Sequence, residues 1–201
     1  MTVANCERPR CAACDFGKFR HQLDTVKTIK KNNMKDKYLK KDHLQPGNMM
    51  SAVHHISQVP GTLYHTTYKS DPYEMFSGGC VFIDHASGHM SIKHQVAINA
   101  TETIKAKITL EREYQSQGVI IKGYHTGNGI FNTSEFLEEL FGEQKKIRFT
   151  GAGTSYQNGI AECIIRTLVT MTRTILMHAV LRSTEDTLST DIWRIEMDYY
   201  V

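Results

Sequence analysis

The fold class of this chain depends on the stretch Tyr156–Leu168, YQNGIAECIIRTL, which joins a glycine-rich loop to a long amphipathic pattern. The pattern predicts a helix from about Ile160 to Leu181. Apolar side chains recur there at the three- and four-residue spacing of a buried face, at Ala161, Ile164, Ile165, Leu168, Ile175, Leu176 and Ala179. Glu162 falls in the first turn, where a carboxylate commonly serves the helix dipole or pairs with Arg166 four residues later. Taken alone, the stretch predicts a core helix and no particular chemistry.

Short segments rich in strand-forming residues precede this helix. They predict strands near residues 49–56, 80–85, 90–98, 118–124 and 146–150. The second and third flank the turn signal Ala86-Ser87-Gly88, and we expect them to pair as a hairpin. The fourth includes Val119-Ile120-Ile121, an apolar run that indicates a strand buried on both faces.

Two helices are predicted between these strands. Periodicity places the first at Thr101–Gln117, ended by Gly118. Its apolar side is made of Ile104, Ile108 and Tyr114. The second covers Thr133–Phe141, with Asn132 and Glu135 expected to form its capping pair. A helix followed by a buried strand is typical of the crossover connections of an α/β sheet.

A length of 201 residues with 40% hydrophobic and 22% charged residues fits one globular domain and excludes collagen-like or wholly disordered chains. No run reaches the ~18 uninterrupted apolar residues of a membrane span, and even Ile175–Leu181 contains His178. The N-terminus has no stretch suited to a secretory signal, and five cysteines are an odd number for a disulfide framework. We therefore expect an intracellular protein, nuclear or cytoplasmic, that is not secreted and has no membrane partner.

Positive charge is concentrated in the first quarter of the chain. Residues 1–50 hold eleven Lys and Arg against five Asp and Glu, whereas residues 51–201 hold thirteen against sixteen. The densest part is the basic arm Lys27–Lys41, whose candidate nucleic-acid contacts are Lys30, Lys31, Lys35, Lys37, Lys40 and Lys41. Such an arm attracts phosphate backbones without reading sequence, although a solvated linker has the same composition.

The motif Cys11-Ala-Ala-Cys14 has the spacing of two thiolates that share one Zn²⁺ ion. A closed structural site needs four ligands, and the downstream His21 and His43 lack the paired spacing of a complete finger. We interpret the motif as half a zinc site whose thiols stay free.

Two further motifs are informative in combination. Gly127-Asn128-Gly129 lies within Tyr124–Phe131 (YHTGNGIF), and Gln157–Glu162 (QNGIAE) opens the long helix. In order, spacing and context they resemble the integrase core of copia-type long-terminal-repeat retrotransposons. The resemblance covers nearly the whole chain, since Phe82–Ser87 resembles that family's second core strand and Cys11–Cys14 the end of its histidine–cysteine zinc module.

This resemblance implies a ribonuclease H-like α/β fold: a five-stranded mixed sheet with flanking helices, preceded by a partial zinc module and a basic arm. It divides the chain into a zinc-module remnant at 1–22, a basic linker at 23–45 and a catalytic core-like domain at 46–201. We expect that core to be truncated at its C-terminus.

The resemblance also implies a site in which two aspartates and a glutamate hold two Mg²⁺ ions, because hard divalent cations need carboxylate oxygens. Glu162 matches the glutamate. The second aspartate position is Gly127, 35 positions earlier (162 − 127), and the first falls at Val53. Asp84 in the second strand is a weak substitute. The nearby residues that suit a softer metal such as Zn²⁺ are His54, His55 and His125.

We therefore predict a degenerate polynucleotidyl transferase core that is catalytically inactive, binds Mg²⁺ unproductively, and contacts DNA through the basic arm, Arg166 and Arg173. Integrases act as multimers, so the resemblance implies self-association. An active enzyme is the alternative if Asp84 or a histidine fills a vacant ligand position. A third hypothesis is a small α/β protein- or RNA-interaction module without transferase ancestry.

Overall fold

The computed structural model describes residues 44–63, 75–151, 159–183, 189–199 and 201. The predictions for Cys11, Cys14, the basic arm and the loop residues Gln157 and Asn158 lie outside these residues. The elements are β1 (Met50–Gly61), β2 (Phe76–Asp84), β3 (Met90–Gln95), α2 (Ala100–Ser116), β4 (Gly123–Thr126), the 3₁₀ turn η4 (Ile130–Asn132), α3 (Ser134–Gly142), β5 (Lys146–Phe149), α4 (Gly159–Arg182), the 3₁₀ turn η6 (Thr190–Ile192) and α5 (Trp193–Asp198).

The five strands form one mixed sheet in the order β3-β2-β1-β4-β5. β1 and β2 pair antiparallel, as do β2 and β3, which confirms the predicted hairpin. β4 is parallel to both β1 and β5, and α2 provides the crossover between β3 and β4. The predicted fold class, an α/β fold with a five-stranded mixed sheet and flanking helices, is confirmed.

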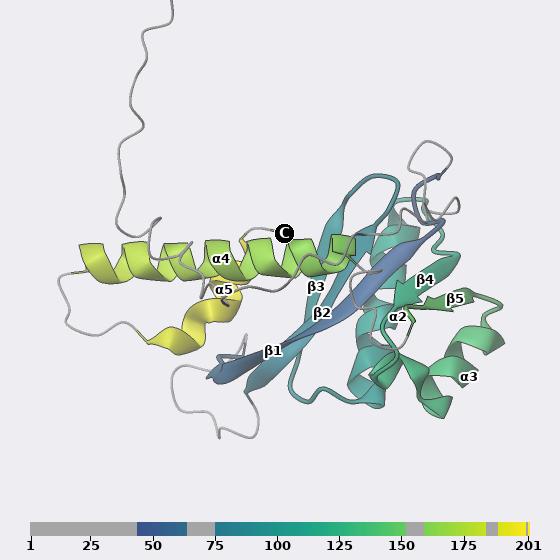
Figure 1. Cartoon of the computed structure of the whole chain (residues 1–201), viewed down its shortest axis with the longest axis horizontal. Helices are drawn as coiled ribbons and strands as arrows, with labels where there is room; N and C mark the ends of the chain where they lie inside the picture. The colour runs from purple at the N-terminus through teal and green to yellow at the C-terminus, as the bar shows by residue number, and fades with distance from the viewer. Residues whose placement is uncertain (1–43, 64–74, 152–158, 184–188, 200) are drawn as a thin grey trace, which may run out of the picture.

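Helices cover both faces of this sheet (Figure 1). α2 and α3 pack on one face through a cluster that includes Phe82, Leu110 and Tyr124. α4 and α5 pack on the other through a cluster that includes Val81 and Leu168. Successive strand residues alternate between these faces, so neighbours in β1 contact different helices. The C-terminal half of α4 extends past the strands, with α5 beside it (Figure 1).

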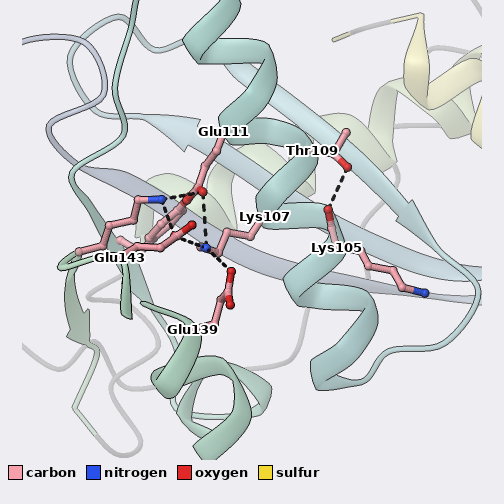
Figure 2. Close-up of polar contacts among 8 residues, drawn as sticks. Lys105, Lys107, Thr109, Glu111, Glu139 and Glu143 are labelled. Carbon is pink, nitrogen blue, oxygen red and sulfur yellow. Dashed lines mark hydrogen bonds and ion pairs between the residues drawn. The ribbon is translucent and has the colours of Figure 1, made fainter. Parts of the chain in front are cut away.

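A cluster of ionised side chains joins α2 to α3 and to the segment between α3 and β5 (Figure 2). Lys107, fully buried, places its Nζ 2.5 Å from Glu143 Oε2, 3.3 Å from Glu139 Oε1 and 3.4 Å from Glu111 Oε2. Lys145 bridges Glu111 and Glu143, at 2.6 Å from each. The helical pattern of α2 gave no sign of a buried lysine, because its partners come from distant segments. The buried face of α2 consists of Thr103, Ala106, Lys107, Leu110 and Tyr114.

The prediction of a strand at Val119–Ile121 is wrong. β4 begins at Gly123, and the Lys122 N–H donates to the carbonyl of Gly47 at 2.8 Å. A parallel strand needs an extended partner, and β1 begins only at Met50, after the turn at Gly47. Val119 and Ile121 still contribute to the core.

The predicted capping pair Asn132 and Glu135 is also wrong. Asn132 belongs to η4, and Thr133 is the N-cap of α3 with no side-chain hydrogen bond to the helix. The Thr133 hydroxyl instead donates to the carbonyl of Ile130 at 2.9 Å. The tight turn after Gly129 therefore sets where α3 begins.

α4 is long and apolar enough to cross a membrane by length and composition alone, and within the described ranges it is the one helix that is. Core helices of soluble proteins pass the same test, although only 11% of the apolar window of α4 is buried. α4 buries Ala161 and Leu168 against the sheet, which accounts for part of its apolar pattern.

Candidate active site

The register of β1 and β4 brings two of the three predicted ligand positions together. Ala52 of β1 is the partner of Thr126 of β4, and this is the last parallel pair of the two strands. Val53 and Gly127 directly follow these partners in the chain. Catalytic and ligand-binding groups of α/β sheets gather at the carboxyl ends of parallel strands. Gly127 follows the carboxyl end of β4, whereas β1 continues to Gly61. The two positions therefore lie side by side where β4 ends against β1.

The start of α4 adds the third position. Val53 packs against the cluster on the α4 face of the sheet, and fully buried Ala161 belongs to the same cluster. Glu162 follows Ala161 in the first turn of α4 and is half-buried. The first turn of α4, which carries Glu162, therefore packs on the same face of the sheet as Val53.

The side chains at these positions do not fit a pair of Mg²⁺ ions. Valine has no ligand atom, glycine has no side chain, and Glu162 alone supplies a carboxylate. Within the described parts of the chain, no three His, Cys, Asp or Glu side chains form a group able to hold a metal ion. Of the three predicted ligand positions, Glu162 alone therefore offers an oxygen ligand from its side chain.

Gly127 has room for a larger side chain. A Cβ atom added there meets no heavy atom within 4 Å, and its φ lies outside the left-handed region. Gly79 in β2 is different, because an added Cβ would lie 2.6 Å from the carbonyl oxygen of Lys93. The glycine at position 127 is therefore not required by packing or by backbone conformation.

Asp84 organises the turn between β2 and β3. Its Oδ1 accepts the Gly47 N–H at 3.1 Å, and its Oδ2 accepts the Ser87 N–H at 2.9 Å and the Ser87 hydroxyl at 2.6 Å. Asp84 is fully buried and pairs with Met50, three residues before Val53 along β1. The structure thus gives this carboxylate a structural role, away from Val53, Gly127 and Glu162.

The three histidines considered for a softer metal do not come together. His54 faces α2, where its ring stacks on Phe131 at 4.5 Å and its Nε2 lies 2.9 Å from Thr103 Oγ1. Burial lowers the pKa of His54 to about 4. His55 faces the opposite side, next to Trp193. His125 is the partner of Ser51 in the β1–β4 ladder.

A buried contact between Ser51 and His85, next to His125, was not predicted. Ser51 Oγ lies 2.8 Å from Nε2 of His85, and both residues are buried. Burial lowers the pKa of His85, with a smaller effect in the same direction from His125 and an opposing one from Asp84. The two residues are 34 positions apart, so no local sequence pattern relates His85 to Ser51.

Arg166 and Arg173 lie on exposed parts of α4. Seven residues correspond to about two helical turns, so the two guanidinium groups belong to the same flank of α4 as Glu162. Cys163 is also exposed. The structure therefore exposes both arginines on the flank of α4 that carries Glu162, with Arg166 one turn away from it and Arg173 about three turns away.

No protein-family model matches this chain, and the search of curated proteins returns no match. Solved structures do match. A chain of the simian T-cell lymphotropic virus intasome in complex with PP2A regulatory subunit B56 gamma aligns with a TM-score of 0.53 and 14% identity, covering 76% of this chain. This chain spans about half, 47%, of that one.

The HTLV-2 integrase catalytic core domain in complex with magnesium (trimeric form) aligns with a TM-score of 0.51 and 17% identity, covering 78% of this chain and 83% of that one. The fold is therefore that of retroviral integrase catalytic cores, the ribonuclease H-like fold. At this level of identity the likeness describes the fold alone.

Proposed function

We propose that this chain is the core of a copia-type retrotransposon integrase that has lost two of its three metal-binding carboxylates. It binds nucleic acid and does not catalyse DNA-end processing or strand transfer. The copia lineage rests on the motifs YHTGNGIF and QNGIAE. The first begins in β4, and the described residues of the second, Gly159–Glu162, open α4.

The observation that carries the proposal is the β1–β4 register. Because Ala52 pairs with Thr126, Val53 lies next to Gly127 where β4 ends, and Glu162 is in the first turn of α4. This juxtaposition supports the assignment of the three positions to one site. Two metals about 3.5–4 Å apart need several carboxylate oxygens to hold them. One glutamate supplies too few carboxylate oxygens, so this site does not activate a nucleophile to attack a phosphodiester.

Nucleic-acid binding is the activity that outlasts such a loss. Contacts to phosphates depend on positive charge and not on the metal ligands. Arg166 and Arg173 are exposed on α4, and the basic arm adds six lysines between positions 30 and 41. The expected binding is salt-dependent and indifferent to DNA sequence.

The test compares the wild-type chain with the double variant Val53→Asp/Gly127→Asp in strand-transfer and DNA-binding assays with Mg²⁺ or Mn²⁺. The proposal expects DNA binding without strand transfer from the wild type, and strand transfer from the double variant if any variant regains it. Val53→Asn/Gly127→Asn is the matched control, because it has similar shape without the charge. Metal-dependent strand transfer by the wild type, lost in Glu162→Gln, would refute the proposal.

A further inference from the structure

The turn after β4 contains an asparagine followed by a glycine, Asn128-Gly129, in an uncrowded setting. Both residues are exposed and lie outside the helices and strands. A Cβ atom added at Gly127 or at Gly129 would meet no heavy atom within 4 Å. The main chain on either side of Asn128 therefore has room to rotate, and glycine has no side chain that restricts this rotation.

The main-chain N–H of Gly129 is available for reaction. Within the described parts of the chain it donates no hydrogen bond, although the Gly129 carbonyl accepts the Asn132 N–H at 3.1 Å. The amide nitrogen that follows an asparagine can attack the side-chain carbonyl carbon, Cγ, and close a five-membered succinimide ring. A side chain on the residue that carries this nitrogen hinders the attack, and glycine has none.

Asn99 and Asn132 are also exposed but lack this combination. Asn99 is the N-cap of α2, where its Oδ1 accepts the Glu102 N–H at 2.9 Å, and an alanine follows it. Asn132 is followed by a threonine, whose N–H donates to the carbonyl of Ile130 at 3.2 Å. The attacking nitrogen would therefore be shielded by a side chain after both residues, and after Asn132 it is also engaged in a hydrogen bond.

We propose that Asn128 is a site of spontaneous deamidation, and that the reaction releases the turn after β4 from the end of β5. The Gly129 nitrogen loses its proton to hydroxide and bonds to Asn128 Cγ. The bond between Cγ and Nδ2 then breaks, and Nδ2 takes up a proton and leaves as ammonia. Water, the one further reactant, opens the succinimide: attack at Cγ gives aspartate, and attack at the main-chain carbonyl carbon gives β-linked isoaspartate.

The lost amide group is the one that holds the turn to β5. Asn128 Nδ2 donates to the carbonyl of Thr150 at 3.0 Å, and the Thr150 N–H donates to the carbonyl of Thr126 at 2.9 Å. An ionised carboxylate accepts hydrogen bonds but donates none. After deamidation, residue 128 therefore has no donor for the Thr150 carbonyl, and two acceptor groups face one another.

The new carboxylate does not replace an aspartate at position 127. β4 lies between β1 and β5 in the sheet, and the Asn128 amide contacts Thr150 after β5, whereas Val53 lies on β1. The isoaspartate product also inserts the Cβ atom of residue 128 into the main chain directly after Gly127. The reaction needs neither nucleic acid nor a metal ion, so this proposal is independent of the proposed function.

Peptide mass spectrometry of the folded full chain tests the proposal. The protein is incubated at mildly alkaline pH, where the attacking nitrogen loses its proton more readily, and a sample digested without incubation corrects for modification during digestion. Trypsin releases residues 123–145, which contain Asn128 and Asn132, and residues 94–105, which contain Asn99. The expected result is the mass increase of an amide that becomes an acid, located by fragmentation at Asn128, with both aspartate and isoaspartate present.

Three outcomes would overturn the proposal: an unmodified Asn128, conversion no faster than that of Asn132 on the same peptide, or aspartate as the single product. A second asparagine-glycine pair, Asn158-Gly159, lies on the separate tryptic peptide 149–166, so its modification cannot be mistaken for that of Asn128.

A variant of the following residue tests the route of the reaction. Gly129→Ala adds a methyl group in open space, at a φ outside the left-handed region, and shields the attacking nitrogen. We expect slower conversion of Asn128 than in the wild type. Gly142→Ala, also in open space at the end of α3, is the matched control and is expected to convert Asn128 at the wild-type rate. Equal rates in the two variants would refute the succinimide route.

The effect on the turn is measured with Asn128→Asp, which has the carboxylate from the start. Hydrogen exchange of the Thr150 N–H, followed by nuclear magnetic resonance, is expected to be faster in this variant than in unmodified wild-type protein, because the neighbouring bond to the Thr150 carbonyl is lost. The Gly88 N–H, which donates to the carbonyl of Asp84 in a different turn, is expected to exchange at the same rate in both. Unchanged exchange at Thr150 would show that deamidation does not release the turn from β5.

Discussion

Lys107 Nζ lies 2.5 Å from Glu143 Oε2, which joins the middle of α2 to the end of α3 across 36 residues of sequence. Burial, the largest single effect, lowers the pKa of Lys107, but the carboxylates of Glu143, Glu111 and Glu139 together raise it above its usual value. The lysine therefore stays charged although its side chain is fully buried. This cluster also holds β4, because the Tyr124 hydroxyl donates to Glu111 Oε1 at 2.5 Å.

Lys107→Met is expected to lower the free energy of unfolding by about 2–4 kcal/mol, because it removes the buried cation shared by three glutamates. Lys145 stays paired with two of them, Glu111 and Glu143. Chemical denaturation at neutral pH measures the change. Lys105→Met is the matched control on the same helix: Lys105 is exposed, pairs with Glu102 at 2.7 Å, and its loss is expected to cost under about 0.5 kcal/mol. Equal losses in the two variants would contradict this account.

The residues of this cluster show why some of the fold could not be predicted. The helix pattern of α2 follows from residues three and four apart, and it placed the helix within one residue of its bounds. The burial of Lys107 depends on Glu139 and Glu143, 32 and 36 residues away, so no local pattern contains it. The start of β4 depends in the same way on where β1 begins.

The assignment of Val53, Gly127 and Glu162 to one site stays a prediction. It came from the order and spacing of the motifs, and the parallel register of β1 and β4 brings Val53 next to Gly127. Contacts between distant segments were not predictable. His54 and His55 are adjacent in sequence but face opposite sides of the sheet. Asp84 accepts the N–H of Gly47, a turn residue 37 positions earlier that no local pattern relates to it.

His54 is expected to make the fold less stable in acid. Its pKa is about 4 in the folded chain and 6.5 when exposed, so between these values the unfolded state binds more protons. Protonation of His54 therefore has no effect on the free energy of unfolding above about pH 6.5 and lowers it as the pH falls towards 4. At about 1.36 kcal/mol per pKa unit, the loss reaches roughly 3 kcal/mol. Denaturant unfolding at the two ends of this range measures it.

The matched comparison uses His54→Gln, which keeps a hydrogen-bonding group towards Thr103 and cannot take up a proton in this range. We expect His54→Gln to lose stability less steeply with acid than the wild type does. His89→Gln, at an exposed position, is the control and is expected to show the same pH dependence as the wild type. An unchanged slope in His54→Gln would show that its protonation is not linked to unfolding.

Arg166→Ala/Arg173→Ala is expected to weaken DNA binding several-fold for every DNA sequence and to reduce the salt dependence of the binding constant by about two contacts. Fluorescence anisotropy at several salt concentrations measures both quantities. Lys105→Ala removes a positive charge from α2 on the opposite face of the sheet and serves as the control. Deletion of residues 1–45 tests the basic arm separately. Binding that is unchanged in both the double variant and the deletion would exclude these contacts.

Restoring the carboxylates is expected to make stability depend on Mg²⁺. Gly127→Asp alone adds a side chain in open space and is expected to change stability by less than about 0.5 kcal/mol. In Val53→Asp/Gly127→Asp, a carboxylate replaces an apolar side chain that packs beneath α4, and three like charges converge near Glu162. We expect this variant to melt below the wild type without a divalent ion and to gain stability as Mg²⁺ is added, because an ion that binds only the folded state stabilises it.

The wild type and the uncharged Val53→Asn/Gly127→Asn variant are expected to show no such gain. Thermal melts across a Mg²⁺ series distinguish these outcomes without any measurement of catalysis. A gain in the wild type equal to that of the double variant would mean that residues other than those at positions 53 and 127 hold the metal.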